Sequence, residues 1–133
     1  MRLWHYSLIP VLPNKMLVSQ WRECVAIKRQ WENGTLTHRL VNYIVDYPKS
    51  YFLWYVNQVC TALLDRGINY NTKLFLEIEN YCKDHTPFTY TIDNYPEHNE
   101  EYLKQCYYNL QEKYNRGIIS ETEWQKIDNI KVV

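Results

Sequence analysis

The feature that most constrains the fold of this chain is a helical repeat between residues 14 and 32. Mostly apolar side chains recur there at spacings of three and four, which places them on one face of a helix. The members of this face are Met16, Leu17, Gln20, Trp21, Cys24, Ile27, Lys28 and Trp31. Asn14 is the predicted N-cap, and Asn33-Gly34 predicts a left-handed cap at the other end. The sequence therefore predicts an α-helix over about 14–32.

The same signals predict further helices. A second helix begins at Pro48 and Ser50, ends at Arg66-Gly67 and is apolar around much of its circumference, as a buried central helix is. The others are expected over about 72–83, over about 99–115 before Gly117, and from the capping box Ser120-Glu121-Thr122-Glu123. We therefore expect a compact all-α domain of four to five helices with long loops that spans residues 1–133.

Three segments lack a helical pattern. The start is expected to run extended, with the apolar run Leu8–Leu12 pinning it against the first helix. Residues 35–47 are rich in β-forming side chains but too short to build a sheet, so an extended connector with a strand-like piece is expected. Residues 84–98 carry two prolines and several turn formers, which predict a loop.

The composition excludes several classes of protein. Hydrophobic stretches are short and interrupted by charge, and the start lacks a signal-peptide pattern, so we expect no membrane span and a cytoplasmic location. The four cysteines form no CxxC pair, which predicts reduced, buried thiols and no metal. The four scattered histidines are expected to be surface or hydrogen-bonded side chains. No cofactor motif is present, and none is expected to bind.

Aromatic content and charge distribution leave a nucleic-acid function open. The 13 Tyr and 5 Trp suit a tyrosine-rich core, which composition favours, or stacking surfaces for bases. Net charge is zero, but residues 1–40 hold six Lys and Arg against two Glu, a net charge of +4, and the remainder carries −4. A basic first third can form one attractive face for polyanions, although such a split also arises by chance.

The opening stretch offers one chemical possibility. An α-amino group has an ordinary pKa of about 7.7–8.0, so it needs less help than a lysine to act as a nucleophile near neutral pH. A terminal amine fixed beside a carboxylate is a plausible nucleophile with its own acid or base, and Glu23 on the first helix can be that partner. The alternative is that Glu23 pairs with Lys15 or a neighbouring arginine on a solvated helix face.

A resemblance to a known family favours the chemical interpretation. Leu8, Leu12, Leu17, Arg22 and Glu23 keep an ungapped spacing from the N-terminus, and the similarity continues through Asn33-Gly34, 41–44 and 64–69. These residues resemble the endonuclease V-type pyrimidine-dimer DNA glycosylases, small all-α repair enzymes of phages and bacteria, and in particular the bacterial branch. The resemblance is good over residues 1–70 and loose beyond them.

The resemblance implies an activity on double-stranded damaged DNA. In the family, the α-amine of the first residue attacks the sugar C1′, the base is released, and β-elimination from the resulting Schiff base cuts the strand. The essential glutamate of the family falls on Glu23, and an arginine suited to phosphate contact falls on Arg22. Further phosphate contacts are expected from Arg2, Lys28, Arg29 and Arg39. We expect a monomer, associated with the nucleoid.

The chain departs from the family at its reactive end. The nucleophile of the family is a threonine exposed by removal of the initiator methionine, whereas the second residue here is Arg2. Because methionine is normally trimmed only before a small residue, Met1 is expected to stay and to supply the amine, at most about 3.3–3.6 Å further out. A basic residue one turn after the family glutamate falls on Ala26 or Ile27, and a histidine of the phage enzyme falls on Met16.

Three functions follow as hypotheses. The first is a DNA glycosylase with AP-lyase activity that uses Met1 and Glu23, and it predicts borohydride trapping on abasic DNA. The second is a relative that binds DNA or nucleotides without this chemistry, which predicts salt-dependent binding and no trapping. The third is a helical protein-interaction module, which predicts neither.

Overall fold

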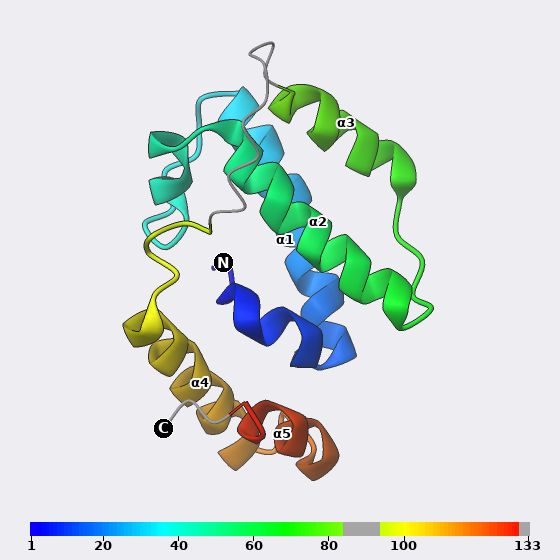
Figure 1. Cartoon of the computed structure of the whole chain (residues 1–133), viewed down its shortest axis with the longest axis vertical. Coiled ribbons are helices and arrows are strands. Elements are labelled where there is room, and N and C mark those ends of the chain that lie inside the picture. Colours follow the sequence, from blue (N-terminus) through cyan, green and yellow to red (C-terminus); the bar gives the residue numbers. More distant parts are fainter. Residues whose placement is uncertain (84–93, 131–133) are drawn as a thin grey trace.

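The computed structural model describes residues 1–83 and 94–130. The α-helices of this part are α1 (Asn14–Glu32), α2 (Lys49–Asp65), α3 (Thr72–Cys82), α4 (Glu100–Asn115) and α5 (Glu121–Asp128), as Figure 1 shows. Two 3-10 helices, η1 (Tyr6–Val11) and η2 (Asn42–Asp46), complete the order, and the described residues contain no strand. The expected all-α class and the four to five helices are confirmed. None of the described helices is long and apolar enough to cross a membrane.

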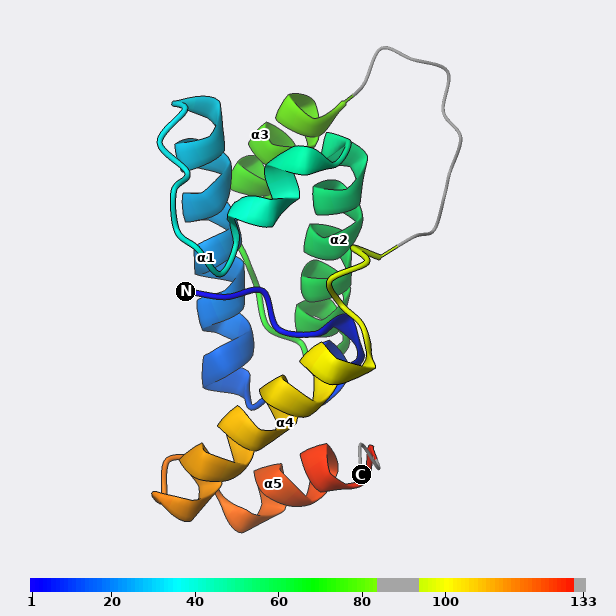
Figure 2. The same ribbon diagram turned by 90° about the vertical axis from the view of Figure 1, so that its left-hand side faces the viewer.

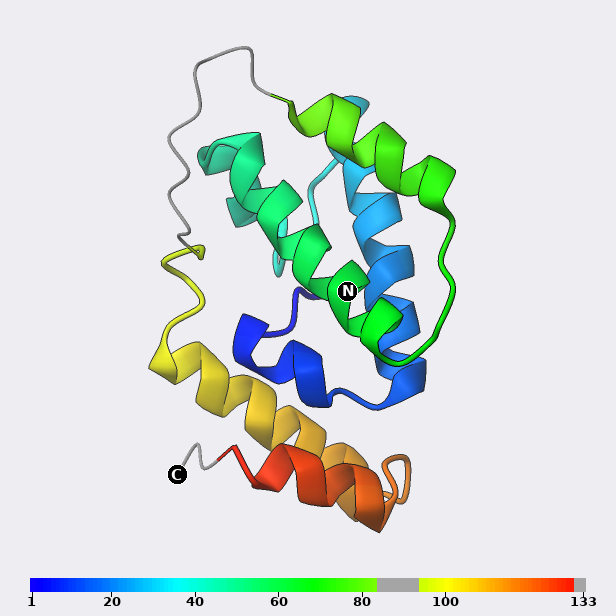
Figure 3. The same cartoon turned by 45° about the vertical axis from the view of Figure 1, so that its right-hand side comes forward.

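The helices form two groups joined by η1. Helices α1, α2 and α3 pack against one another, and α4 and α5 form a pair at one end of the molecule (Figure 2). Between them lies η1, which contacts α2 on one side and α5 on the other (Figure 3). The start of the chain is therefore an internal element of the fold.

One hydrophobic core runs through all of these helices. Its centre is α2, as expected, with Phe52, Tyr55, Val56 and Val59 almost entirely buried. All four cysteines are buried, as expected.

The N-terminal segment corrects one expectation. Residues 6–11 are not extended but form the 3-10 helix η1, which the His5 side chain caps by accepting a hydrogen bond from the Ser7 amide. The expected anchoring is nevertheless present, because Leu8, Ile9 and Leu12 are each at most 1% exposed. Only residues 1–5 approach α1 as irregular, non-helical chain.

The predicted helix ends are largely confirmed. Gly34 follows α1 with a φ of 72°, in the left-handed region that favours glycine. Ser120 and Glu123 form the complete capping box of α5. The prediction for Asn14 was wrong: Pro13 is the N-cap residue, and the Asn14 side chain instead accepts a hydrogen bond from Arg66 at the end of α2.

The connector after α1 also differs from the expectation. Residues 35–47 contain no strand-like piece but end in η2, with Val41 and Ile44 fully buried three residues apart. That spacing matches a 3-10 turn, in which residues i and i+3 share a side. Of the expected loop over 84–98, residues 84–93 lie outside the described part, and 94–98 contain turns without a helix.

Candidate active site

Residues 1–5 are held against α1 by a buried amide. The Gln20 side chain is 1% exposed, and its Oε1 accepts a hydrogen bond from the Trp4 amide at 2.8 Å. Its Nε2 donates to the carbonyl of Arg2 at 3.0 Å. From α2, the Tyr55 hydroxyl donates to the Trp4 carbonyl and to Gln20 Oε1. The backbone next to the terminal amine therefore has a fixed position on the helix.

Glu23 lies one turn further along α1, beside this backbone. Its Oε2 accepts a hydrogen bond from Gln20 Nε2 at 3.1 Å, and its carboxylate is also bonded by the backbone N–H of Arg2. The terminal ammonium of Met1 is close enough to interact electrostatically with this carboxylate. The structure thus brings Met1 and Glu23 together, as the catalytic hypothesis requires.

The surroundings of Glu23 act on its acidity in opposite directions. Burial raises the pKa of the carboxyl group and dominates. The positive terminus, the Arg2 amide, His38 and the Arg2 side chain lower it, but they do not cancel the effect of burial. A carboxyl group with a raised pKa exchanges protons more readily near neutral pH, which suits an acid or base in catalysis.

His38 reaches this site from the connector that follows α1. Figure 2 shows the connector returning alongside α1 towards the N-terminus. The His38 side chain is exposed, and its Nδ1 accepts a hydrogen bond from the Leu40 amide. The sequence predicted a surface or hydrogen-bonded histidine, which is confirmed, but not its place beside Glu23.

The half-buried Arg2 side chain contacts both the N-terminal segment and α4. Its guanidinium lies 5.3 Å from the Trp4 ring centre and interacts with the Tyr102 hydroxyl and the Cys106 thiol. Tyr102 also donates to the Leu3 carbonyl at 2.5 Å. Helix α4 therefore supports the N-terminal segment from the side opposite to Gln20.

The buried histidines belong to the core of the protein. His5 Nε2 is bonded to the His98 carbonyl, and His98 Nε2 is bonded to the Tyr43 hydroxyl at 2.7 Å. Burial and the neighbouring His5 lower the pKa of His98 to about 3, so it stays neutral. No group of three or more His, Cys, Asp or Glu side chains able to hold a metal occurs among residues 1–83 and 94–130.

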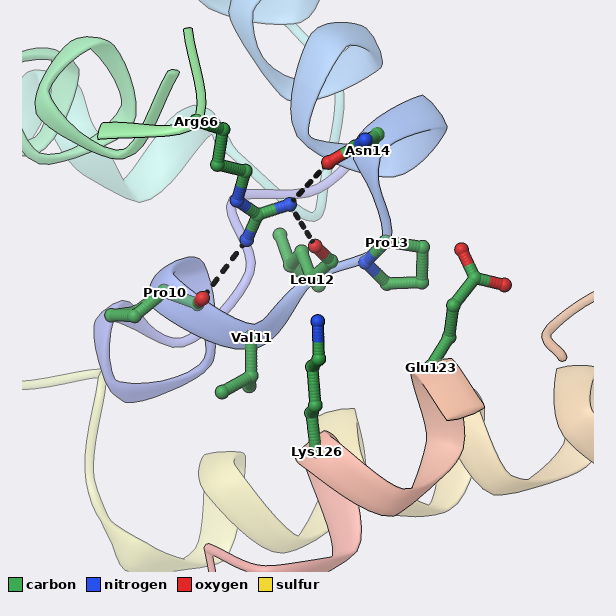
Figure 4. Close-up of a pocket in the computed structure, with 8 residues that line it drawn as sticks. All are labelled: Pro10, Val11, Leu12, Pro13, Asn14, Arg66, Glu123 and Lys126. Atoms are coloured by element: carbon green, nitrogen blue, oxygen red, sulfur yellow. Dashed lines mark hydrogen bonds between the residues drawn. The ribbon is translucent and has the colours of Figure 1, made fainter. Parts of the chain in front are cut away.

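One cavity of the described part of the chain is separate from Glu23. It has a volume of about 340 Å³ and lies where η1 meets α1, between the end of α2 and α5 (Figure 4). Its lining residues are Pro10, Val11, Leu12, Pro13, Asn14, Arg66, Glu123 and Lys126. Arg66 spans one side and bonds the carbonyls of Pro10 and Leu12. The candidate site is accordingly an open surface rather than this cavity.

Comparison with protein families identifies the part of the chain that builds the site. The family described as pyrimidine dimer DNA glycosylase matches residues 1–76, more than half of the chain. The chain belongs to this pyrimidine dimer DNA glycosylase family. Searches among curated proteins and among solved structures found no match. Membership supports a DNA-repair function of this glycosylase type, with DNA as the substrate.

The basic side chains predicted to contact DNA differ in where they lie on this member of the glycosylase family. Arg22 and Arg29 are exposed and seven residues apart on α1, so they share one face with Lys15, which is also exposed. A shallow depression between Lys15 and Arg22 lies on this face. We call Lys15, Arg22 and Arg29 the basic stripe. Arg39 is exposed and follows His38 in the connector after α1.

Lys28 and Arg2 are placed differently from the basic stripe. Lys28 forms an ion pair with Glu32 and lies 5.7 Å from the ring centre of Tyr81 on α3, with its side chain only 14% exposed. Arg2 is held by α4, as described above. Their phosphate contacts remain predictions, and the structure does not bring either side chain onto the stripe.

Three residues of the site carry little or no signal in the sequence. Gln20 appeared only as one member of the inward face of the first helix, where a single amide among apolar residues was the available signal. His38 and Tyr102 reach the site from 15 and 79 residues beyond Glu23, and no local pattern marks them.

Proposed function

We propose that this chain is a DNA glycosylase and AP lyase that acts on pyrimidine dimers and abasic sites in double-stranded DNA. The nucleophile is the α-amine of Met1, and Glu23 is the acid and base. The observation that carries the proposal is the electrostatic interaction of the terminal ammonium with the partly buried Glu23 carboxylate, which also accepts a hydrogen bond from Gln20. The family match supplies the class of substrate.

The proposed reaction begins with attack of the neutral amine on the sugar C1′. The bond from C1′ to the base breaks, its electron pair leaves with the base, and the base takes up the proton that the amine loses. The sugar ring then opens as the nitrogen forms an imine with C1′ and its second proton moves to the ring oxygen. Removal of a C2′ proton finally expels the 3′ phosphate and cuts the strand.

Glu23 is suited to the proton transfers of this scheme. Its carboxylate accepts a proton from the attacking amine and returns one to the leaving base or the ring oxygen. Its raised pKa favours the return step, and the nearby positive groups keep an ionised fraction for the first step. The same negative charge stabilises positive charge that develops on the sugar.

The open surface around Glu23 fits a substrate that approaches as a duplex. The basic stripe lies about 80–120° around α1 from Glu23, so phosphates bound along it would place the backbone near the carboxylate. Such contacts position DNA without reading its sequence, which suits a search for lesions at any sequence.

Borohydride trapping tests the proposal directly. Protein and duplex DNA with one abasic site or one pyrimidine dimer are mixed with borohydride, and a covalent adduct is measured by gel mobility. Mass spectrometry of the free protein verifies that Met1 carries an unmodified amine, and of the adduct that this nitrogen holds the sugar. Adduct formation at Met1 supports the proposal. Salt-dependent binding without any adduct would instead favour the DNA-binding relative, and an adduct on a lysine would refute the role of the terminus.

A further inference from the structure

Gln20 has an unusual environment for a polar side chain. Only three polar side chains are buried among residues 1–83 and 94–130, namely His5, Gln20 and His98. A glutamine amide can accept two hydrogen bonds through its oxygen and donate two through its nitrogen. In Gln20 all four are made, two by Oε1 and two by Nε2.

The partners of Gln20 include groups next to both proposed reactants, the terminal amine and the Glu23 carboxylate. On one side are the Trp4 amide and the Arg2 carbonyl, which flank Leu3 in the segment that ends in the terminal amine. On the other is Oε2 of Glu23, bonded by the same Nε2 that holds Arg2. A single planar group, locked from behind by the Tyr55 hydroxyl, therefore ties the backbone of the nucleophile to the carboxylate.

We propose that Gln20 is the positioning residue of this site: its buried amide sets the distance and orientation between the terminal amine and the Glu23 carboxylate. The inference rests on the proposed function, and it adds a residue that acts on the reaction without touching DNA. The carbonyl that Gln20 binds belongs to Arg2, the residue next to Met1. The hydrogen bonds of Gln20, which we call the clamp, therefore act close to the terminal amine.

The chemistry of an amide is needed at this position. Methionine fills a similar volume but makes none of the four bonds, which leaves the Arg2 carbonyl and Glu23 without their shared donor. Glutamate keeps oxygen acceptors for the Trp4 amide and the Tyr55 hydroxyl. Its second oxygen, however, faces the Arg2 carbonyl and the Glu23 carboxylate, where a donor is required. The two replacements therefore remove the clamp in different ways.

The size of the expected effect follows from geometry. Release of the clamp lets the terminal residue and the carboxylate move independently, and a misplacement of about 1 Å can slow a reaction about 100-fold. We expect trapping per folded molecule to slow by about 10- to 100-fold in Gln20→Met and in Gln20→Glu. The affinity for abasic DNA should stay within about twofold, because Gln20 is buried away from the basic stripe.

The experiment compares the wild type with Gln20→Met, Gln20→Glu and a matched control, Gln30→Met. Gln30 is a half-buried glutamine on the same helix, about 15 Å further along its axis. Single-turnover trapping on abasic duplex is measured over pH 5–9, with the folded fraction from circular dichroism and DNA affinity from fluorescence anisotropy. Carbon-13 NMR follows the titration of the Glu23 carboxyl group in the absence of DNA.

The outcomes separate this inference from the proposed function. Slow trapping with unchanged affinity in both Gln20 variants, an upward shift of the Glu23 titration, and a control equal to the wild type support the role of Gln20. Loss of folded protein without a change in rate per folded molecule would overturn it, because a purely structural residue behaves in that way. If Gln20→Met does not fold, Gln20→Glu decides alone, since it keeps two of the four bonds. If the wild type does not trap, the proposed function fails and this inference with it, whereas equal rates in wild type and variants refute only the inference.

Discussion

Arg66 offers a quantitative test of how the start of the chain is held in place. It ends the central helix α2 and reaches across to the corner between η1 and α1. Its guanidinium donates to the Leu12 carbonyl at 2.5 Å, to Asn14 Oδ1 and the Pro10 carbonyl at 2.9 Å, and to the Ile9 carbonyl at 3.4 Å. Replacement of Arg66 by methionine keeps most of the stem and removes these bonds.

The expected loss is dominated by one bond. Pro10 and Asn14 are exposed beside a cavity of about 340 Å³, so water can replace the guanidinium there. Leu12 is buried, and the Ile9 bond is long, so only the Leu12 carbonyl loses a short charged donor at a buried residue. A hydrogen bond to a charged group contributes about 1.5–3 kcal/mol to stability. For a chain of this size that corresponds to a fall in Tm of about 5–12 °C.

Thermal unfolding followed by circular dichroism measures this effect. The matched control is Arg116→Met, since Arg116 is exposed and its nearest carboxylate oxygen, on Glu112, is 3.9 Å away. Exposed substitutions of this kind change stability by at most about 0.5 kcal/mol, or about 2 °C here. If Arg66→Met unfolds within 2 °C of the wild type, as the control should, then the corner is held by packing alone and the account of Arg66 is wrong.

Four further predictions concern the site itself. Glu23→Gln should abolish trapping but retain DNA binding, and a trapped adduct in this variant would remove Glu23 from the mechanism. Burial raises the pKa of Glu23, so ionisation of this group costs the folded state stability as pH rises above the ordinary glutamate pKa of about 4.3. The Tm of Glu23→Gln minus that of the wild type should therefore increase as pH rises from about 4. Acetylation of the terminal amine should abolish trapping, whereas Lys15→Met, which also removes a member of the basic stripe, should still give the adduct at saturating DNA. The reverse result would make Lys15 the nucleophile. Arg22→Ala should weaken binding to intact and damaged duplexes alike and reduce the slope of log affinity against log salt concentration by about one. Lys28 is already paired with Glu32, so Lys28→Met should change DNA binding less than Arg22→Ala does.

The helices could be predicted because the residues that end or begin each helix lie close together in the sequence. Gly34, Gly67 and Gly117 follow α1, α2 and α4 with φ values of 72°, 69° and 77°, which glycine adopts without strain. Ser120 and Glu123 satisfy the first amides of α5. Each of these signals involves residues a few positions apart, so a single sequence is enough to find them.

The 3-10 segments could not be predicted by the same reasoning. Over 41–44 the sequence is rich in β-forming side chains, and a spacing of three in so short a stretch does not distinguish a turn from a strand. In η1 the deciding contact is the His5 side chain on the Ser7 amide, which no periodicity reveals. Packing of Leu8 and Ile9 into the core then outweighs the extended tendency of a segment with prolines.

Only part of the candidate site could be predicted from the sequence. Glu23 and the terminus were identified through a family resemblance, since the residues alone favoured a pairing of Glu23 with Lys15 or a neighbouring arginine. Three of the contacts that define the site join a side chain to backbone atoms, namely Gln20 to Arg2 and to Trp4, and Arg2 to Glu23. Backbone atoms are the same in every residue, so such contacts leave no trace in residue identities.

The bond from Tyr102 to the Leu3 carbonyl has an evolutionary consequence. The family match covers residues 1–76, so Tyr102 and helix α4 lie outside the matched part of the chain. Drift in α4 is therefore not neutral for the proposed chemistry: a substitution at Tyr102 changes the support of the N-terminal segment while every residue of the family pattern stays the same. Two chains with the same residues 1–76 would then differ in the rate of the proposed reaction if they differ at Tyr102.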